Sequence, residues 1–225
     1  MQSFLRKTVI LVWKDLLIDL RRRDNIPSML LFLTMNLLIF QFAIGEDTRI
    51  FMITLPGIIW VVFFFTGVLG LGKSFLQELE SDCLGGLLSS PVERSVLFLG
   101  KMLANTLFLM ITLLIFIPLV IILFGIELRS WYGLFSLVFF GIVGLSSLGT
   151  LLSALTISVK GKELLLPVLI FPLMIPGLLC VVNLTGFLFF GQNQEEAWRW
   201  WKLLIGFDVI LFTVSLLGFE FVIED

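Results

Sequence analysis

The sequence contains no histidine, one tyrosine and two cysteines among its 225 residues. Without histidine the chain lacks the commonest metal ligand, haem ligand and general base. Cys83 and Cys180 lie far apart in different sequence contexts and show no metal-ligand spacing, so neither a disulfide nor a metal site is expected. The sequence therefore predicts no catalytic, metal-ligating or cofactor-binding residue in this chain.

Charged residues are also scarce. They make up 14% of the chain, against about 25% of an average soluble domain. Hydrophobic residues make up 59% and the mean hydropathy is +1.10, which is more apolar surface than a soluble fold of this size could bury. Lipid is therefore expected to surround most of the chain. The net charge of −2 disfavours a nucleic-acid-binding protein.

Six stretches are long and apolar enough to cross a bilayer, at residues 26–44, 50–71, 102–124, 134–159, 164–182 and 203–223. Backbone polar groups in lipid must be satisfied within the segment, which favours helices over strands. No internal repeat or linker interrupts the chain. We therefore predict an all-α polytopic membrane protein with six transmembrane helices, in which residues 1–225 form a single domain.

Lysine and arginine residues are distributed unequally between the two sides of the predicted membrane. Eleven of the fifteen lie in the N-terminal segment or in the loops after the second and fourth spans, and loops rich in lysine and arginine stay in the cytoplasm. Both termini are therefore predicted to be cytoplasmic. Residues 183–202, which include three tryptophans, are interpreted as a re-entrant or interfacial segment on the outer side.

The first 25 residues precede the first span and show a helical pattern. Apolar residues recur every three or four positions, and charged residues fall largely on the opposite side: Leu5, Val9, Val12, Trp13, Leu16 and Leu20 against Lys7, Lys14, Asp15, Asp19 and Arg22. This pattern predicts an interfacial helix in the headgroup layer, with its cationic face toward anionic lipid. A soluble packing helix is the alternative.

Residues 67–74 read GVLGLGKS and satisfy the G-x-x-x-x-G-K-[ST] pattern of a phosphate-binding loop. Such a loop follows a buried strand and opens a helix, with free backbone N–H groups directed at the phosphates. Here the preceding residues are LPGIIWVVFFFT, which join the motif into one apolar span. We therefore expect a membrane helix at these residues, with no nucleotide bound.

The predicted loop at residues 73–101 carries an amphipathic pattern. One side is apolar and acidic residues lie beside it, which predicts a short helix that couples the chain to a cytoplasmic partner. The predicted coupling residues are Glu78, Glu80, Leu84, Leu87, Leu88, Pro91 and Arg94. A solvated loop is the alternative interpretation.

Polar residues and prolines inside the spans are further candidates. Asp208 and Glu220 lie within the sixth span, Asp208 in its outer third, and intramembrane carboxylates are functional candidates by default. Pro167, Pro172 and Pro176 in the fifth span predict either a hinge or kinked packing. The small-residue stripe in the fourth span is assigned to close helix packing.

The residues QELESDCLGGLLSSPVERSVLFLGK resemble the E-x-E…LL-x-x-P…LGK stretch of ABC-2-type exporter permeases. Together with WKDLLIDLRRRDNIPSMLLF and the six-span layout, the whole chain resembles the haem exporter protein B family of cytochrome c maturation permeases. This chain departs from the broader pattern at Gly85, where an acidic residue often stands, which weakens the assignment of a second acidic contact.

The resemblance implies a non-enzymatic permease subunit in the bacterial inner membrane, driven by ATP through a separate cytoplasmic ABC ATPase. Its task would be haem export or the ATP-driven release of a haem-loaded chaperone, beside other cytochrome c maturation membrane proteins. Haem is then the candidate cargo, with no cofactor bound directly by this chain. Two alternatives stay open, namely an ABC-2 exporter for lipid, polysaccharide or drug, and a membrane scaffold without transport.

Overall fold

The structure is a computed structural model that describes residues 2–21, 25–45, 48–80, 93–128, 130–155, 162–191 and 194–222. These residues form long helices and short connections. The helices are α1 (Gln2–Arg21), α2 (Asn25–Ile44), α3 (Thr48–Glu80), α5 (Arg94–Phe124), α6 (Trp131–Leu155), α7 (Lys162–Phe190) and α8 (Gln194–Val222). The described part of the chain contains no strand, and the all-α prediction is confirmed.

Six of these helices are long and apolar enough to span a membrane, which confirms the predicted number of spans. Their ends differ from the prediction. The candidate span on α5 begins at Arg94, and the candidate span on α7 continues to Phe190. A helix can extend past the most apolar stretch from which a span is predicted. The predicted coupling loop is shortened at both ends, since residues 73–80 continue α3 and residues 94–101 begin α5.

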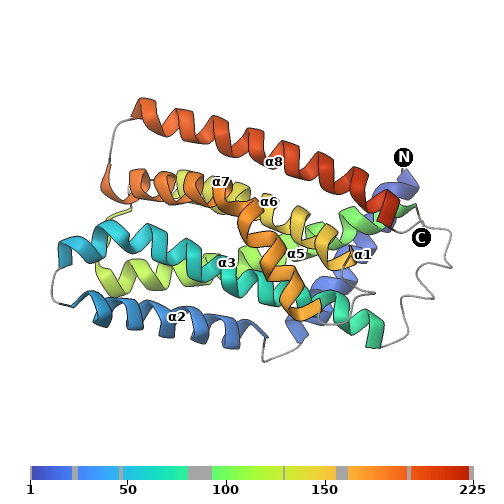
Figure 1. Ribbon diagram of the computed structural model, residues 1–225, viewed down its shortest axis with the longest axis horizontal. Helices are drawn as coiled ribbons and strands as arrows, with labels where there is room; N and C mark the ends of the chain where they lie inside the picture. Colours follow the sequence, from blue (N-terminus) through green and yellow to red (C-terminus); the bar gives the residue numbers. More distant parts are fainter. Residues whose placement is uncertain are drawn as a thin grey trace.

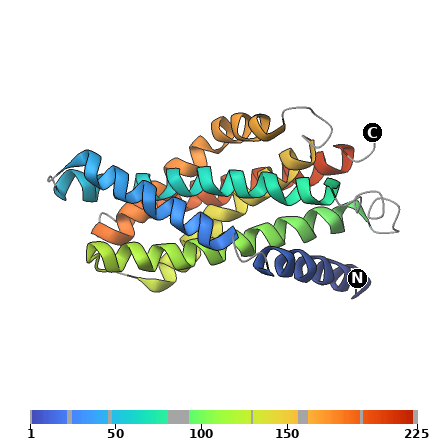
Figure 2. The same cartoon turned by 90° about the horizontal axis from the view of Figure 1, so that it is seen from below.

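The six long helices from α2 to α8 alternate in direction, and both chain ends lie on the same side of the bundle (Figure 1). That side holds α1, the end of α3, the start of α5 and the last turns of α6 and α8; we refer to it as the α1 end. Helix α1 does not join the bundle but lies alongside the first half of α5 (Figures 1 and 2).

Two apolar clusters hold the helices together. The main core fills the bundle between α2, α3, α5, α6, α7 and α8, with Leu33, Phe63, Leu109 and Leu145 fully buried. A smaller second cluster lies at the α1 end. It comprises Leu97, Phe98 and Met102 of α5, Leu151 and Ala154 of α6, and Phe219 of α8, with Leu11 of α1 packed against it. The start of α5 thus packs with α1, α6 and α8 in this second cluster.

The prolines of α7 lie inside a helix that bends. Pro167, Pro172 and Pro176 all fall between Lys162 and Phe190, and α7 changes direction along its length in both views (Figures 1 and 2). Proline removes a backbone donor and its ring crowds the preceding turn, so prolines account for the bend. Kinked packing is therefore present, and movement about this bend stays a prediction.

The re-entrant interpretation of residues 183–202 is wrong. Residues 183–190 are the last two turns of α7, and α8 begins at Gln194. The turn between them starts at Gly191, whose φ of 68° is left-handed and therefore suits glycine. Helical periodicity continues through the polar residues of this stretch, which is why hydropathy alone placed the end of the span too early.

Candidate functional site

The predicted coupling residues that the structure describes lie at helix ends on the α1 end. Glu78 and Glu80 belong to the last turn of α3, and Arg94 is the first residue of α5. Leu84, Leu87, Leu88 and Pro91 lie outside the described residues. The fold therefore places the two flanks of the coupling segment on the same side of the bundle (Figure 1).

Helix α1 is fitted closely against the start of α5 at Gly100. A Cβ added to Gly100 would come within 2.9 Å of Leu11 Cβ, so the missing side chain makes room for α1. Thr8, one turn earlier on the same side of α1, is also buried. Helix packing at this separation needs a small residue at the crossing point, and glycine at position 100 supplies it.

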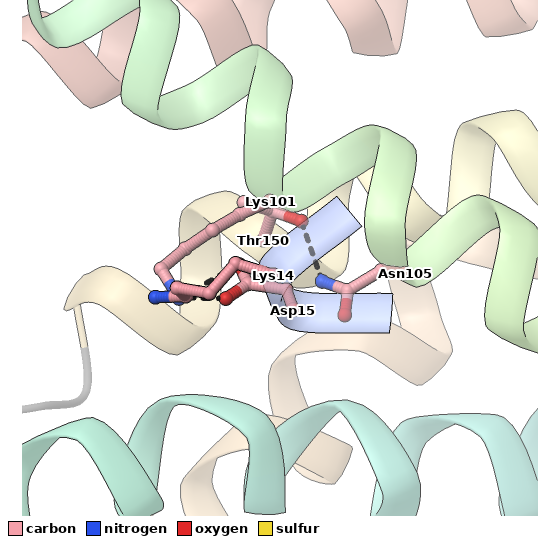
Figure 3. Close-up of polar contacts among 5 residues, drawn as sticks. All are labelled: Lys14, Asp15, Lys101, Asn105 and Thr150. Carbon is pink, nitrogen blue, oxygen red and sulfur yellow. Dashed lines mark hydrogen bonds and ion pairs between the residues drawn. The ribbon is translucent and has the colours of Figure 1, made fainter. Parts of the chain in front are cut away.

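A buried ion pair lies one turn further along this contact (Figure 3). Lys101 Nζ lies 3.7 Å from Asp15 Oδ2, and Asp15 and Lys101 are only 9% and 8% exposed. Lys14 Nζ approaches the other Asp15 oxygen at 2.9 Å, with its side chain 42% exposed. Removing one partner of a buried ion pair costs about 3–5 kcal/mol, because the other charge is left uncompensated.

This contact corrects the predicted orientation of α1. The sequence pattern predicts Asp15 on the charged side of the helix, opposite the apolar face, but Asp15 faces α5 and is buried there. The apolar residues Leu5, Val9 and Trp13 are exposed instead, as expected of side chains that meet lipid. Helical periodicity separates the faces of a helix but does not show which face a neighbouring helix covers.

A second polar contact lies one turn deeper in the bundle (Figure 3). Asn105 Nδ2 donates a hydrogen bond of 3.1 Å to Thr150 Oγ1 on α6. Thr150 Oγ1 in turn donates to the Ser146 carbonyl at 2.7 Å. All three residues are buried. Lys101 and Asn105, four residues apart on α5, thus connect this helix to α1 on one side and to α6 on the other.

These polar contacts of Lys101 and Asn105 were not predicted from the sequence. The sequence pattern puts Lys101 at the end of the predicted loop 73–101 and Asn105 in the third predicted span, and it indicates no role for Asn105. The available signal was a lysine and an asparagine four residues apart inside the apolar run LFLGKMLANTLFLM, a pattern that puts both side chains on one helix face. The Ser146 and Thr150 stripe of α6 packs inside the bundle as predicted.

Asp208 lies between α6 and α8, close to the middle of a span that runs from Glu195 to Phe219 rather than in its outer third. The residue is 5% exposed. Its Oδ1 occupies a notch at Gly144, where an added Cβ would come within 2.5 Å of that oxygen. Its Oδ2 is buried and has no hydrogen-bond partner among the described residues, which is unusual for a polar atom. Glu220 follows in the last turns of α8, and its side chain lies outside the described part.

Filling the Gly144 notch is expected to destabilise the α6–α8 contact. Gly144→Ala places a methyl group where Asp208 Oδ1 lies, and overpacking costs about 1–3 kcal/mol. We expect a lower unfolding temperature in detergent, partly restored in the double variant Gly144→Ala/Asp208→Ala. The matched control is Gly206→Ala on α8, where an added Cβ meets nothing within 4 Å. Equal unfolding temperatures for the two single variants would contradict the notch.

The apparent phosphate loop is part of a continuous helix. Residues 67–74 lie within α3, so the expected helical structure is confirmed. The backbone N–H groups of a helix interior are bonded along the helix and cannot cradle a phosphate. Gly67 contributes close packing instead, since an added Cβ would lie 3.3 Å from Leu145 and 3.4 Å from Leu109. Gly70 faces Met29 in the same way. Gly67 and Gly70 thus bring neighbouring helices together.

We expect the purified chain to bind no ATP. In a working phosphate loop the lysine contacts the phosphates, and replacing it with alanine abolishes hydrolysis. Because Lys73 lies in a helix, Lys73→Ala is expected to keep the ATPase rate of the assembled complex within about tenfold, or about 1.4 kcal/mol. Equilibrium dialysis with labelled ATP gives the direct measurement. Saturable binding by this chain alone, lost in Lys73→Ala, would overturn the helical interpretation.

Comparisons with known proteins agree with this architecture. The family profile described as "CcmB protein" matches residues 6–223. A protein named "Heme exporter protein B" from Pseudomonas aeruginosa is 31% identical over 159 residues, which cover 71% of each chain. Proteins of the same name from Haemophilus influenzae and Rhodobacter capsulatus are 26% and 27% identical over 169 residues, which cover 75% of this chain and 76% and 78% of theirs.

Proposed function

Because this chain belongs to the CcmB protein family, we propose that it is the membrane permease subunit of an ABC transporter complex that serves cytochrome c biogenesis. The observation that carries the proposal is the family match over residues 6–223, which spans all six candidate membrane helices. The multi-pass membrane fold is what a permease subunit requires.

The ATPase of this complex is proposed to be a separate cytoplasmic subunit. It would bind the coupling segment between α3 and α5, at residues Glu78 to Arg94, on the α1 end of the bundle. Lysine and arginine are more frequent in the segments at the α1 end than at the other end of the bundle. This excess supports a cytoplasmic position for the α1 end and for both termini in a bacterial inner membrane. This chain then transmits the effect of ATP hydrolysis rather than catalysing it.

The proposed task is haem export or the ATP-driven release of a haem-loaded chaperone outside the cytoplasm. The names of the relatives support haem as the cargo. Other cytochrome c maturation membrane proteins are the proposed neighbours in the bilayer. An ABC-2 exporter for lipid, polysaccharide or drug would share this fold but has no support from the relatives, and a scaffold without transport would need no acidic coupling segment.

Deletion of the gene tests the proposal. We expect the deletion strain to lose covalently bound haem in all c-type cytochromes, seen by haem staining of denaturing gels, and to keep its b-type cytochromes. Complementation with the wild-type chain should restore the stain. Normal c-type cytochromes together with altered surface glycans or lipids in the deletion strain would favour the general exporter instead.

A further inference from the structure

We propose that Asp15 and Lys101 are positioning residues that hold α1 on the start of α5, so that the two helices move as one body when the ATPase acts on the coupling segment. The inference rests on the proposed function for the source of the movement. The contact itself is a property of the fold.

Shape and charge both fix the position of α1. Leu11 fills the space that Gly100 leaves, with 2.9 Å between Leu11 Cβ and the position of an added Cβ. One turn away Asp15 faces Lys101, and both side chains are buried from solvent. Because bulk water hardly reaches either charge, a nearby opposite charge stabilises each of them, and Lys14 supplies a second cation to Asp15 at 2.9 Å. Sliding or rotating α1 would separate Asp15 from Lys101.

The ion pair is also close to the coupling segment. Lys101 follows Arg94, the first residue of α5, by seven residues, which is two helical turns or about 10 Å. A displacement of Arg94 along the helix axis therefore reaches Lys101 through hydrogen-bonded helix. Since Lys101 is paired with Asp15, α1 would follow this displacement.

The start of α5 also contacts α6 and α8. Phe98 packs against Phe212 and Phe219 of α8, with ring centroids 6.3 Å and 5.2 Å apart. Asn105, one turn after Lys101, is bonded to Thr150 of α6. This second cluster is separate from the main core. The start of α5 is therefore joined to α6 and α8 as well as to α1, while Leu16 of α1 also packs against the main core.

A cross-link tests whether α1 stays on α5 during the cycle. Leu11→Cys and Gly100→Cys, in a chain with Cys83→Ser, place two sulfurs where the Cβ atoms lie slightly closer than the about 3.5–4.5 Å of a disulfide. We expect the oxidised complex in nanodiscs to keep its ATPase rate and haem-chaperone release within twofold of the reduced complex. Loss of either activity on oxidation, restored by reductant, would show that α1 must leave α5 and would overturn the proposal.

Charge exchange tests the pair itself. Asp15→Lys and Lys101→Asp are each expected to lower c-type cytochrome formation at least tenfold, while the chain is still inserted and the ATPase is still recovered with it. The double exchange Asp15→Lys/Lys101→Asp should restore formation to within threefold. Lys14→Ala is the matched control, because Lys14 also contacts Asp15 but is half exposed, and it should have little effect.

The outcomes separate this inference from the proposed function. Failure of the wild-type chain to recover any ATPase would contradict the proposed function and leave the α1–α5 contact to be judged by cross-link formation alone. Recovery of the ATPase with wild-type cytochrome levels in both single variants would show that the pair has no positioning role. Loss of the inserted chain in both single variants, without rescue by the exchange, would show that the residues serve folding only.

Discussion

Reversal of one acidic charge in the coupling segment is expected to release the ATPase subunit while this chain stays in the membrane. Glu78→Lys or Glu80→Lys changes the sign of a charge in the last turn of α3, where we propose a basic or dipolar surface on the partner. A like-charge contact at an interface typically costs several kcal/mol. Recovery of the ATPase with the tagged chain should therefore fall at least tenfold, a factor that corresponds to about 1.4 kcal/mol.

Leu84→Asp extends this test to the apolar side of the same segment. A carboxylate in place of an apolar contact leaves a desolvated charge in the interface, so the variant should also lose the partner. The matched control is Glu196→Lys, which reverses an exposed acid in the first turn of α8, at the opposite end of the bundle. All four chains should reach the membrane in equal amounts. Undiminished recovery of the ATPase by the three coupling variants would place the partner elsewhere.

The number of spans could be predicted because hydropathy reports the thickness of the bilayer. It cannot report where a helix ends, since a helix continues beyond the lipid for as long as its backbone bonds are satisfied. Residues 73–80 of α3 show this, since they continue the helix past the candidate span, which ends at Leu71. Hydropathy also shows that the phosphate motif is coincidental, because the apolar run before it and the motif together form one membrane span rather than a strand followed by a loop.

The polar contacts of α5 could not be predicted with the same certainty. Asp15 and Lys101 are far apart in the sequence, and nothing in either segment specifies the other. Periodicity placed Asp15 on a charged face, whereas the choice of the covered face depends on where Gly100 allows α1 to approach. Likewise, the carboxylate of Asp208 could be identified as unusual within a span, but its notch at Gly144 arises only when α6 and α8 are packed.

The purified chain is expected to show no stoichiometric Soret band of axially ligated haem. Iron in haem is usually held by histidine, cysteine, methionine or tyrosine, and the chain has no histidine. Cys180 is 4% exposed inside α7 and Met174, on the same helix, is 2% exposed, so neither can reach haem at the outer surface. The single tyrosine, Tyr132, is 92% exposed in the first turn of α6, at the end of the bundle away from α1.

The absence of histidine leads us to expect that haem handled outside the membrane is ligated by partner subunits, while this chain supplies helices that transmit force. The measurement is an absorption titration of the detergent-purified chain with haem, with Tyr132→Phe as the matched variant. Weak, non-saturating absorbance that is equal in both chains would agree with partition into detergent and apolar surface. One equivalent of haem with a sharp Soret band in the wild type, lost in Tyr132→Phe, would instead make this chain a haem carrier whose axial ligand is that phenolate.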